Sequence, residues 1–314
     1  MSAFLLAAVL AAAAPAAERP LTAPGPLAPL SGTLLAAGKN KPVIVIIPGS
    51  GPTDRDGNNP GGVTASNLRL LAEGLARRGI STVRIDKRGM FGSKAAVASG
   101  NAVTIAAYAT DAHAWAKSAR AATGAKCVWL LGHSEGSLVA LVAAQDRADL
   151  CGVISVSGAG RKLGAVIREQ LQANPANASI LAPAFTTLDR LEKGQRVDST
   201  TLPAPLQGLF NNAVQPYLID LLSQDPTAFA STLKLPLLIV QGGRDLQVKV
   251  ADANLLAAAQ PKARLVILPT VNHMLKIVAT DSPAANFATY SNTSLPIAPG
   301  VVDAIAGFVG KPKR

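Results

Sequence analysis

Short apolar runs alternate with helical patterns along most of the chain. Residues 43–47 (VIVII) form an unbroken β-branched run, which is typical of a strand buried on both faces of a sheet. The following segment, residues 68–75, carries apolar side chains at helical spacing. Continued alternation of this kind predicts an α/β fold with a mostly parallel sheet flanked by helices. Further strands are expected at 80–85, 127–131, 153–156, 235–240 and 265–268, and further helices at 105–115, 137–148 and 301–308.

The N-terminus carries an apolar run from residue 3 to residue 17, with Ala14-Pro15-Ala16 in the place of a cleavage site. We expect residues 1–16 to be a secretory signal peptide and the protein to be periplasmic or secreted, although no Lys or Arg precedes the run. An Ala-rich leader or a buried first helix is the alternative. The run is shorter than the ~20 residues that cross a bilayer, so no stable membrane insertion is expected. Residues 18 to about 29 are Pro-rich and predict an extended arm.

The alternation stops between residues 161 and 232. This stretch lacks β-branched runs, and six prolines divide it into short helices. We therefore expect a helical cap, residues 161–232, inserted into a core of residues 17–160 and 233–314. The cap either covers a substrate pocket or is structural decoration, and we favour the first interpretation. Three apolar side chains of the cap are expected to bind substrate: Leu206, Leu209 and Phe210.

Composition narrows the possible partners. Hydrophobic residues make up 49% of the chain and charged residues only 16%, so the chain can bury a large core. The formal charge is +11, but the basic residues are scattered and the 2 + 3 + 7 = 12 aromatic residues do not interleave with them, which argues against nucleic-acid binding. Two Cys and three His show no zinc-ligand spacing, and no phosphate-binding P-loop occurs. We expect a small-molecule substrate and no metal or cofactor.

A nucleophile candidate lies in the pattern Gly-x-Ser-x-Gly at residues 132–136. The pattern alone is weak, but here a predicted strand precedes it and a predicted helix follows it, which is the context that a nucleophilic serine needs. Glycines on both sides allow the strained turn that lifts the Ser134 hydroxyl above the sheet. The same turn directs the backbone N–H of Glu135 toward a developing oxyanion.

A serine nucleophile needs a base, and His273 is the best placed of the three histidines. It follows the strand at 265–268, so we expect it at the same sheet edge as Ser134. His133 is adjacent to the nucleophile and cannot reach back to it, and His113 lies within a predicted helix. Asp245 follows the strand at 235–240 and gives the chain order Ser, Asp, His.

The loop after the strand at 43–47 supplies a second oxyanion donor. The N–H of Ser50 is the first candidate and that of Gly51 the second, with an ordinary Gly/Pro turn as the alternative. The nearby Asp54 and Asp56 are expected to be structural, because Asp in such turns bonds to neighbouring backbone. We expect Arg88 to pair with one of these carboxylates.

Three segments together resemble the α/β-hydrolase superfamily and, within it, bacterial carboxylesterase-like serine hydrolases, which are often grouped with lysophospholipase-like and serine-aminopeptidase-like relatives. The segments are 49–57 (GSGPTDRDG), 86–93 (DKRGMFGS) and 132–137 (GHSEGS). The resemblance covers nearly all of the chain after the leader. It implies an α/β-hydrolase fold with a helical cap after the sixth strand, a triad of Ser134, Asp245 and His273, oxyanion donors at Ser50 and Glu135, and no cofactor. The two leading strands of the family's sheet are poorly visible before residue 41, where only 32–35 looks like a strand.

The two cysteines open neighbouring strands in the strand order that this resemblance implies. We expect a disulfide between Cys127 and Cys151, since neighbouring strand ends lie within its reach and export leads to an oxidising compartment. Two buried free thiols are the alternative.

The expected function is hydrolysis of carboxylic esters through an acyl-enzyme. A peptidase or a thioesterase on the same scaffold is the first alternative, although the cap offers few charged groups to hold a peptide terminus. A non-catalytic binding protein is the second, but such a protein has no need of a complete triad.

Overall fold

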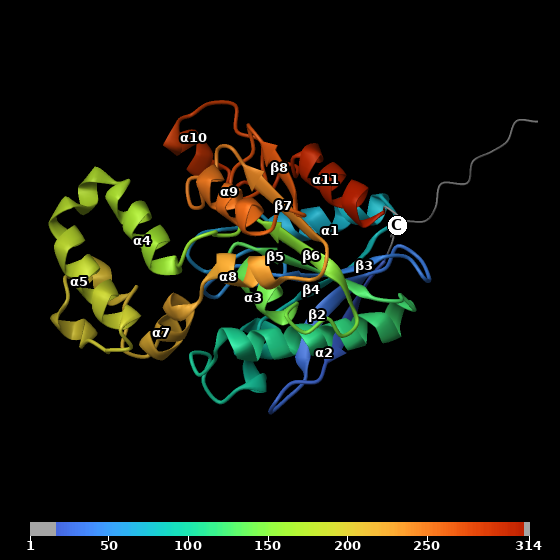
Figure 1. Ribbon diagram of the computed structural model, residues 1–314, viewed down its shortest axis with the longest axis horizontal. Helices are drawn as coiled ribbons and strands as arrows, with labels where there is room; N and C mark the ends of the chain where they lie inside the picture. Colours follow the sequence, from blue (N-terminus) through green and yellow to red (C-terminus); the bar gives the residue numbers. More distant parts are fainter. Residues whose placement is uncertain (1–16, 311–314) are drawn as a thin grey trace, which may run out of the picture.

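The computed structural model describes residues 17–310 (Figure 1). The expected signal peptide, residues 1–16, and the basic C-terminal residues 311–314 lie outside the described residues. Between residues 17 and 310, no helix combines the length and the apolar character that a membrane span requires.

The described part of the chain is built on an eight-stranded sheet with the order β1-β2-β4-β3-β5-β6-β7-β8. Strand β2 runs antiparallel to both of its neighbours, β1 and β4, and all the other neighbours are parallel. The carboxyl ends of the parallel strands therefore lie along one edge, where the predicted site residues follow them. The strands are β1 (Glu18–Ala23), β2 (Leu30–Leu35), β3 (Val43–Ile47), β4 (Ser81–Ile85), β5 (Val128–His133), β6 (Leu150–Val156), β7 (Leu237–Gly242) and β8 (Arg264–Leu268).

Helices cover both faces of the sheet. Val43, Val45 and Ile47 of β3 belong to the apolar cluster on one face, while Ile44 and Ile46 belong to the cluster on the other. This explains why the strand reads as an unbroken apolar run. The first face packs against α2 (Ile105–Thr123), α3 (Glu135–Ala143) and α9 (Val250–Ala259), and the second against α1 (Asn67–Arg77) and α11 (Pro299–Val309), as Figure 1 shows.

The first strand corrects the expectation of an extended arm from residue 18. Strand β1 pairs with β2 along its whole length, from Glu18 opposite Leu35 to Ala23 opposite Leu30. The strand was hard to see because it lies at the sheet edge and buries only one residue, Ala23, completely. Pro20 is tolerated there because an edge strand leaves half of its N–H groups outside the ladder.

The segment between β6 and β7 is helical, with no strand between residues 157 and 236. Most of its helices lie beside the sheet rather than over its faces (Figure 1) and enclose a small apolar core of their own. Pro175 and Pro226 each open a helix, a position where the missing N–H costs nothing. The last helix, α8, packs against α3 and α9 of the sheet layer. The helical segments are α4 (Leu163–Gln172), η2 (Pro175–Ile180), α5 (Leu181–Glu192), η3 (Ser199–Thr201), α6 (Ala204–Gln207), α7 (Gln215–Ser223) and α8 (Pro226–Thr232).

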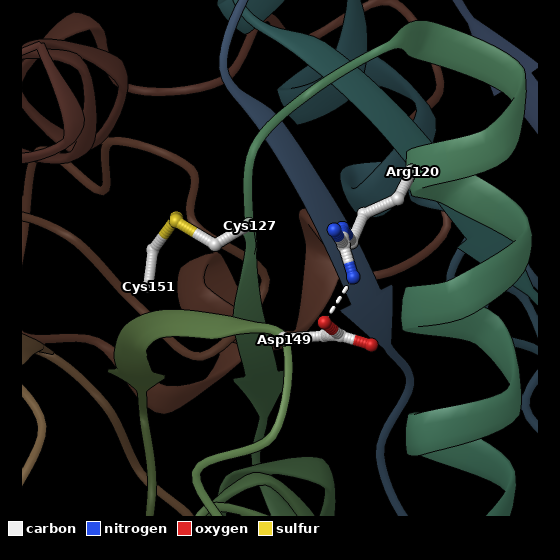
Figure 2. Close-up of a disulfide and its surroundings, with 4 residues drawn as sticks. All are labelled: Arg120, Cys127, Asp149 and Cys151. Carbon is white, nitrogen blue, oxygen red and sulfur yellow. Dashed lines mark hydrogen bonds and ion pairs between the residues drawn. A yellow bond between two sulfur atoms is a disulfide. The ribbon is translucent and has the colours of Figure 1, made fainter.

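A disulfide joins Cys127, just before β5, to Cys151 near the start of β6. The Cα atoms are 5.2 Å apart, as expected for neighbouring strands. The bridge lies at the amino end of these strands, whereas Ser134 follows the carboxyl end of β5. Figure 2 shows an ion pair beside it, between Arg120 of α2 and Asp149 just before β6, which also ties a helix to this end of the sheet.

Two local expectations are wrong. The helix expected at 137–148 spans Glu135–Ala143. Its first residue directly follows Ser134, and beyond its last residue the Asp146 side chain accepts the N–H of Ala148 in a turn. Arg88 pairs with Asp111 of α2 and not with Asp54 or Asp56. Two remaining segments, η1 (Phe91–Ala96) and α10 (Pro283–Ala288), form short helical turns at the rim of the sheet edge.

Candidate active site

Ser134 occupies a strained turn between β5 and α3. Its φ of 56° and ψ of −123° lie outside the regions that residues with a side chain ordinarily adopt. Glycine is required on both sides: a Cβ at position 132 would lie 2.0 Å from the Gly136 carbonyl oxygen, and one at position 136 would lie 2.3 Å from the Ile47 carbonyl oxygen. The glycines of the motif therefore permit the close approach that presents the serine above the sheet.

His273 and Asp245 are hydrogen-bonded to each other in the interior of the protein. The distance from His273 Nδ1 to Asp245 Oδ2 is 2.8 Å, and both side chains are nearly closed to solvent. A carboxylate can only accept, so Nδ1 carries the proton and donates it, which leaves Nε2 with its lone pair. Neither this nitrogen nor the Ser134 hydroxyl bonds to another described residue, and Ser134 and His273 line the same small cavity.

The Asp245 carboxylate is held in its charged form. Burial raises its pKa, but His273 and the N–H groups of Gln247 and Val248 outweigh that effect, and the net result is a pKa below the ordinary value. Oδ1 accepts these two N–H groups at 2.8 and 2.9 Å, and Oδ2 also accepts the Gln241 amide at 3.2 Å. These three donors hold the carboxylate in the orientation in which Oδ2 also accepts from His273.

His133 supports the loop that carries His273. Its Nε2 donates to the His273 carbonyl oxygen at 2.9 Å, and the two rings lie 4.8 Å apart. Burial, together with the neighbouring His273 ring, lowers the pKa of His133 to about 3. The ring is therefore neutral at physiological pH, and its role is structural, as expected from its place next to the nucleophile.

Two peptide units border the Ser134 hydroxyl and have N–H groups suited to an oxyanion. Glu135 is the first residue of α3, so its N–H has no acceptor within the helix. The other unit joins Gly49 to Ser50, and a Cβ at position 49 would lie 3.2 Å from the Ser134 Cβ. These are the two donors expected from the sequence.

Lys87 connects these two units. Its ammonium donates to the Gly49 carbonyl oxygen at 2.7 Å and to Glu135 Oε1 at 2.7 Å, and it lies 5.1 Å from the centre of the Tyr108 ring. In a trans peptide the C=O and the N–H point in opposite directions. The Gly49 carbonyl and the Ser50 N–H belong to the same peptide unit. Because the carbonyl points toward Lys87, the N–H points away from Lys87.

Two cavities meet at Ser134. The larger has a volume of about 470 Å³, lies between the sheet edge and the cap, and is lined largely by apolar side chains, among them Leu138, Val166, Leu209 and Leu221. The smaller has a volume of about 80 Å³ and contains His273. Between residues 17 and 310, no cluster of His, Cys, Asp and Glu has the arrangement of a metal site.

Comparison with known families identifies the family of this fold. Residues 44–289 match the model of the alpha/beta hydrolase family. The matched residues include the sheet from β3 to β8 and the cap. The chain belongs to the alpha/beta hydrolase family. This confirms the fold that the three sequence segments implied.

Proteins similar to this chain include ones named as esterases. The chain is 28% identical over 243 residues to esterase EstD of Thermotoga maritima. The matched region covers 74% of this chain and 54% of the relative, so the chain spans about half the length of that protein. The solved esterase Pf2001 of Pyrococcus furiosus superposes with a TM-score of 0.53 and 18% identity, covering 82% of this chain and 84% of the other. Est1E of Butyrivibrio proteoclasticus superposes with a TM-score of 0.55 and 15% identity, covering 91% and 99%. At this identity the two structures support the fold alone.

Of the three cap residues expected at the substrate, only Leu209 lines either of the two cavities described at Ser134. Leu209 borders the large cavity, but Leu206 and Phe210 are fully buried in the core of the cap. The expectation for these two residues is corrected for a physical reason. A cap of short helices needs an apolar core of its own, and composition alone does not distinguish that core from a pocket wall.

Lys87 was not singled out from the sequence. Its signal was available, because a lysine two residues after the end of strand β4 stands at the same sheet edge as Ser134. Arg161 also lines the large cavity, but its guanidinium is paired with both Glu169 and Asp252. A lysine or arginine in this region is therefore not by itself a substrate anchor.

Proposed function

We propose that the protein hydrolyses carboxylic esters through an acyl-enzyme formed on Ser134. The observation that carries this proposal is the alignment of three elements at one sheet edge: a serine on a strained turn, a buried His273–Asp245 pair, and two N–H groups beside the serine. The relationship to a protein named an esterase supports the same reaction class.

In the first half-reaction, the Ser134 oxygen attacks the ester carbonyl carbon and its proton passes to His273 Nε2. Negative charge develops on the carbonyl oxygen, where the N–H groups of Ser50 and Glu135 stabilise it. The tetrahedral intermediate then collapses and the bond to the alcohol oxygen breaks. His273 returns its proton to that oxygen, and the alcohol leaves.

In the second half-reaction, water takes the place of the alcohol. His273 accepts a proton from the water as it attacks the acyl carbon, and the same proton returns to Ser134 when the acid leaves. Asp245, held in its charged form, stabilises the His273 imidazolium in both halves.

The large cavity suits the acyl part of an aliphatic ester. Its volume of about 470 Å³ compares with about 30 Å³ for a group the size of water, which gives room for a chain of up to roughly a dozen carbons. The sheet core and the cap both line this cavity: Leu138 belongs to the core, and Val166, Leu209 and Leu221 belong to the cap.

An aminopeptidase reaction is less well supported than ester hydrolysis. A peptide terminus needs a charged group with free hydrogen-bonding capacity, and the charged side chains that line the large cavity, Lys87, Glu135 and Arg161, are engaged in ion pairs. Of their polar atoms, Glu135 Oε2 has no hydrogen-bond partner among the described residues, but Oε1 of the same carboxylate is already neutralised by Lys87. A thioester presents the same acyl group as an ester, so a substrate panel separates these reactions.

The experiment is a panel of 4-nitrophenyl esters, acyl thioesters and aminoacyl anilides assayed with the wild type and with Ser134→Ala. We expect turnover of esters above the other classes and a loss of about 10³-fold or more in kcat in the variant. Preferred turnover of anilides contradicts the proposal.

We also propose that the protein is exported to the periplasm or secreted. The apolar leader at residues 1–16 supports this, as does the disulfide between Cys127 and Cys151, because such bridges persist in oxidising compartments. Cell fractionation with N-terminal sequencing of the mature chain is the test. A cytoplasmic protein that retains Met1 contradicts the proposal.

A further inference from the structure

The two cavities that meet at Ser134 differ in their access to His273. Ser50, Ser134 and Gln247 line both cavities, whereas His273 lines the smaller one and not the larger. The group that protonates the leaving oxygen must lie within hydrogen-bond reach of it. If the reaction is the one proposed above, the alcohol part of the ester therefore occupies the smaller cavity, and the acyl chain occupies the larger.

The smaller cavity has hydrogen-bonding walls. Thr53, Asn59, Asn67 and Gln247 line it, and its apolar lining is limited to Val63 and Met274. Its volume of about 80 Å³ corresponds to two or three groups the size of water, at about 30 Å³ each. The cavity thus fits a short polar alcohol better than a long or aromatic one.

Asn67 is the residue of this wall with unused hydrogen-bonding capacity. Its side chain is fully buried, and within residues 17–310 neither Nδ2 nor Oδ1 has a hydrogen-bond partner. Buried polar groups in proteins are nearly always paired, so an amide left in this state at a cavity wall points to a ligand. An amide offers both a donor and an acceptor, which matches a hydroxyl group.

The loop that packs against Asn67 is held in place by its own hydrogen bonds and by ion pairs to the sheet. Gly57 has a φ of 92°, and a Cβ there would lie 2.0 Å from Asn67 Oδ1, so glycine leaves the room that the amide needs. Asp54 accepts the N–H groups of Asp56 and Asn58, at 2.9 and 2.8 Å, and closes the loop on itself. Two ion pairs fasten the loop to the sheet, Arg55 with Asp86 and Arg84 with Asp56.

We propose that the smaller cavity binds the alcohol part of the substrate and that Asn67 hydrogen-bonds a second hydroxyl group on it. The substrate class is then an ester of an aliphatic acid with a small diol. The inference rests on the proposed function and extends it from the reaction to the alcohol that the site selects.

The first test compares 2-hydroxyethyl butyrate with propyl butyrate, whose alcohol parts have equal numbers of non-hydrogen atoms. In an acyl-enzyme mechanism, kcat/KM reports the steps up to alcohol release and excludes attack by water. The wild type is expected to prefer the hydroxyethyl ester by about 3- to 10-fold, the size of one neutral hydrogen bond. Asn67→Leu should remove this preference by lowering kcat/KM for the hydroxyethyl ester alone.

Leu209→Trp is the matched control, because Leu209 lines the large cavity and not the small one. It should change the preference among acyl chain lengths and leave the ratio between the two butyrate esters unchanged. A shift of both preferences in either variant contradicts the assignment of the two cavities.

The second test needs no variant and so does not depend on the folding of Asn67→Leu. The wild type is acylated from 4-nitrophenyl butyrate in the presence of ethylene glycol or 1-propanol at equal concentration. Each alcohol competes with water: its oxygen forms the new ester bond, the bond to Ser134 breaks, and the alcohol proton returns through His273 to the serine. We expect saturable transfer to ethylene glycol that exceeds transfer to 1-propanol by about 3- to 10-fold.

The outcomes separate the two proposals. Hydrolysis of both butyrate esters with equal kcat/KM, or equal transfer to both alcohols, overturns the alcohol site and leaves ester hydrolysis standing. A fall in kcat for both esters at unchanged kcat/KM in Asn67→Leu assigns Asn67 to the attacking water and also overturns the alcohol site. Absence of Ser134-dependent hydrolysis of any ester overturns the proposed function itself.

Discussion

Lys87 and Glu135 form an ion pair that is almost closed to solvent, with 2.7 Å between Nζ and Oε1 and only 3% and 5% of the two side chains exposed. The same ammonium holds the Gly49 carbonyl at 2.7 Å. One buried pair thus links the two backbone units that we assign to the oxyanion. Removing either partner would leave the other charge buried and unpaired, which strongly destabilises a folded protein.

Lys87→Met tests whether this pair positions the oxyanion donors. Without the ammonium, the Gly49–Ser50 peptide loses the contact that sets its orientation, so stabilisation of the transition state should weaken more than binding of the ground state. We expect kcat to fall by about 10- to 100-fold, somewhat less than the loss of a whole donor, with KM nearly unchanged. Steady-state kinetics on a 4-nitrophenyl ester provides both values.

Two further variants separate this positioning role from stability. The exposed Lys94→Met, which removes an equal charge, should leave kcat unchanged. In Lys87→Met/Glu135→Gln the unpaired carboxylate is also removed, so thermal stability should recover relative to Lys87→Met while kcat stays low. Recovery of kcat together with stability would assign Lys87 to folding alone.

His133 predicts a loss of stability in mild acid. Burial, with His273 beside it, lowers its pKa from 6.5 to about 3 in the folded protein. Between pH 6.5 and pH 3 this histidine is protonated in the unfolded chain but stays neutral in the folded protein. Its contribution to the free energy of unfolding is therefore fully present above about pH 6.5 and declines as the pH falls toward 3. The slope for one such group is at most about 1.4 kcal/mol per pH unit. Denaturant unfolding of the wild type and of His133→Gln at pH 7 and pH 5 measures the difference.

The variant should lose less stability than the wild type over that interval, because glutamine does not titrate. His113→Gln is the control, since His113 is half-buried and its ring nitrogen makes a single contact with the Ala143 carbonyl. Equal acid sensitivity of the wild type and His133→Gln would show that other groups dominate the response.

The disulfide is expected to contribute to stability and not to catalysis. The loop that it closes, residues 127–151, has a sequence separation of 24, for which chain entropy gives about 3–4 kcal/mol. For a domain of this size, reduction should lower the Tm by about 5 °C. Because the bridge is at the opposite end of β5 from Ser134, kcat at moderate temperature should not change. Thiol titration of denatured, unreduced protein comes first, and two free thiols per chain would refute the bridge.

Leu209 and Leu206 should respond differently to substitution although both belong to the cap. Leu209→Trp fills part of the large cavity and is expected to shift the best substrate toward shorter acyl chains. Leu206→Ala opens a void in the cap core, so it should cost about 2–5 kcal/mol of stability and leave the chain-length preference in place. Values of kcat/KM for esters of two to twelve carbons decide the matter, and an unchanged profile in Leu209→Trp would mean that the cap does not select the chain.

The sequence predicted most of the sheet and the meeting of Ser134, Asp245 and His273. The buried parallel strands read as unbroken apolar runs, and Ser134 and Asp245 each follow one of them, while His273 follows the partly buried edge strand β8. The sheet edge that the three residues share is a consequence of the parallel topology. The edge strand β1 was not recognised in the sequence, because it buries only Ala23 completely and so shows little alternation of apolar and polar residues.

Other features depend on three-dimensional packing that no local pattern encodes. Leu206 and Leu209 are of the same type and three positions apart, yet one lies in the cap core and the other at the cavity. The sequence can place Lys87 at the sheet edge after β4, but its positioning role follows only from its contact with the Gly49 carbonyl. Asn67 likewise gains its meaning from the absence of a described hydrogen-bond partner and from the cavity beside it.

Reaction with a fluorophosphonate probe, followed by peptide mass spectrometry, tests the central claim most directly. The probe forms a bond with an activated serine, so activation of Ser134 by His273 predicts one label per chain on the peptide that contains residues 132–136. Labelling should match the loss of ester hydrolysis and should disappear in Ser134→Ala and in His273→Ala. Full ester hydrolysis by Ser134→Ala, or stoichiometric labelling of a different serine that abolishes activity, would contradict the account.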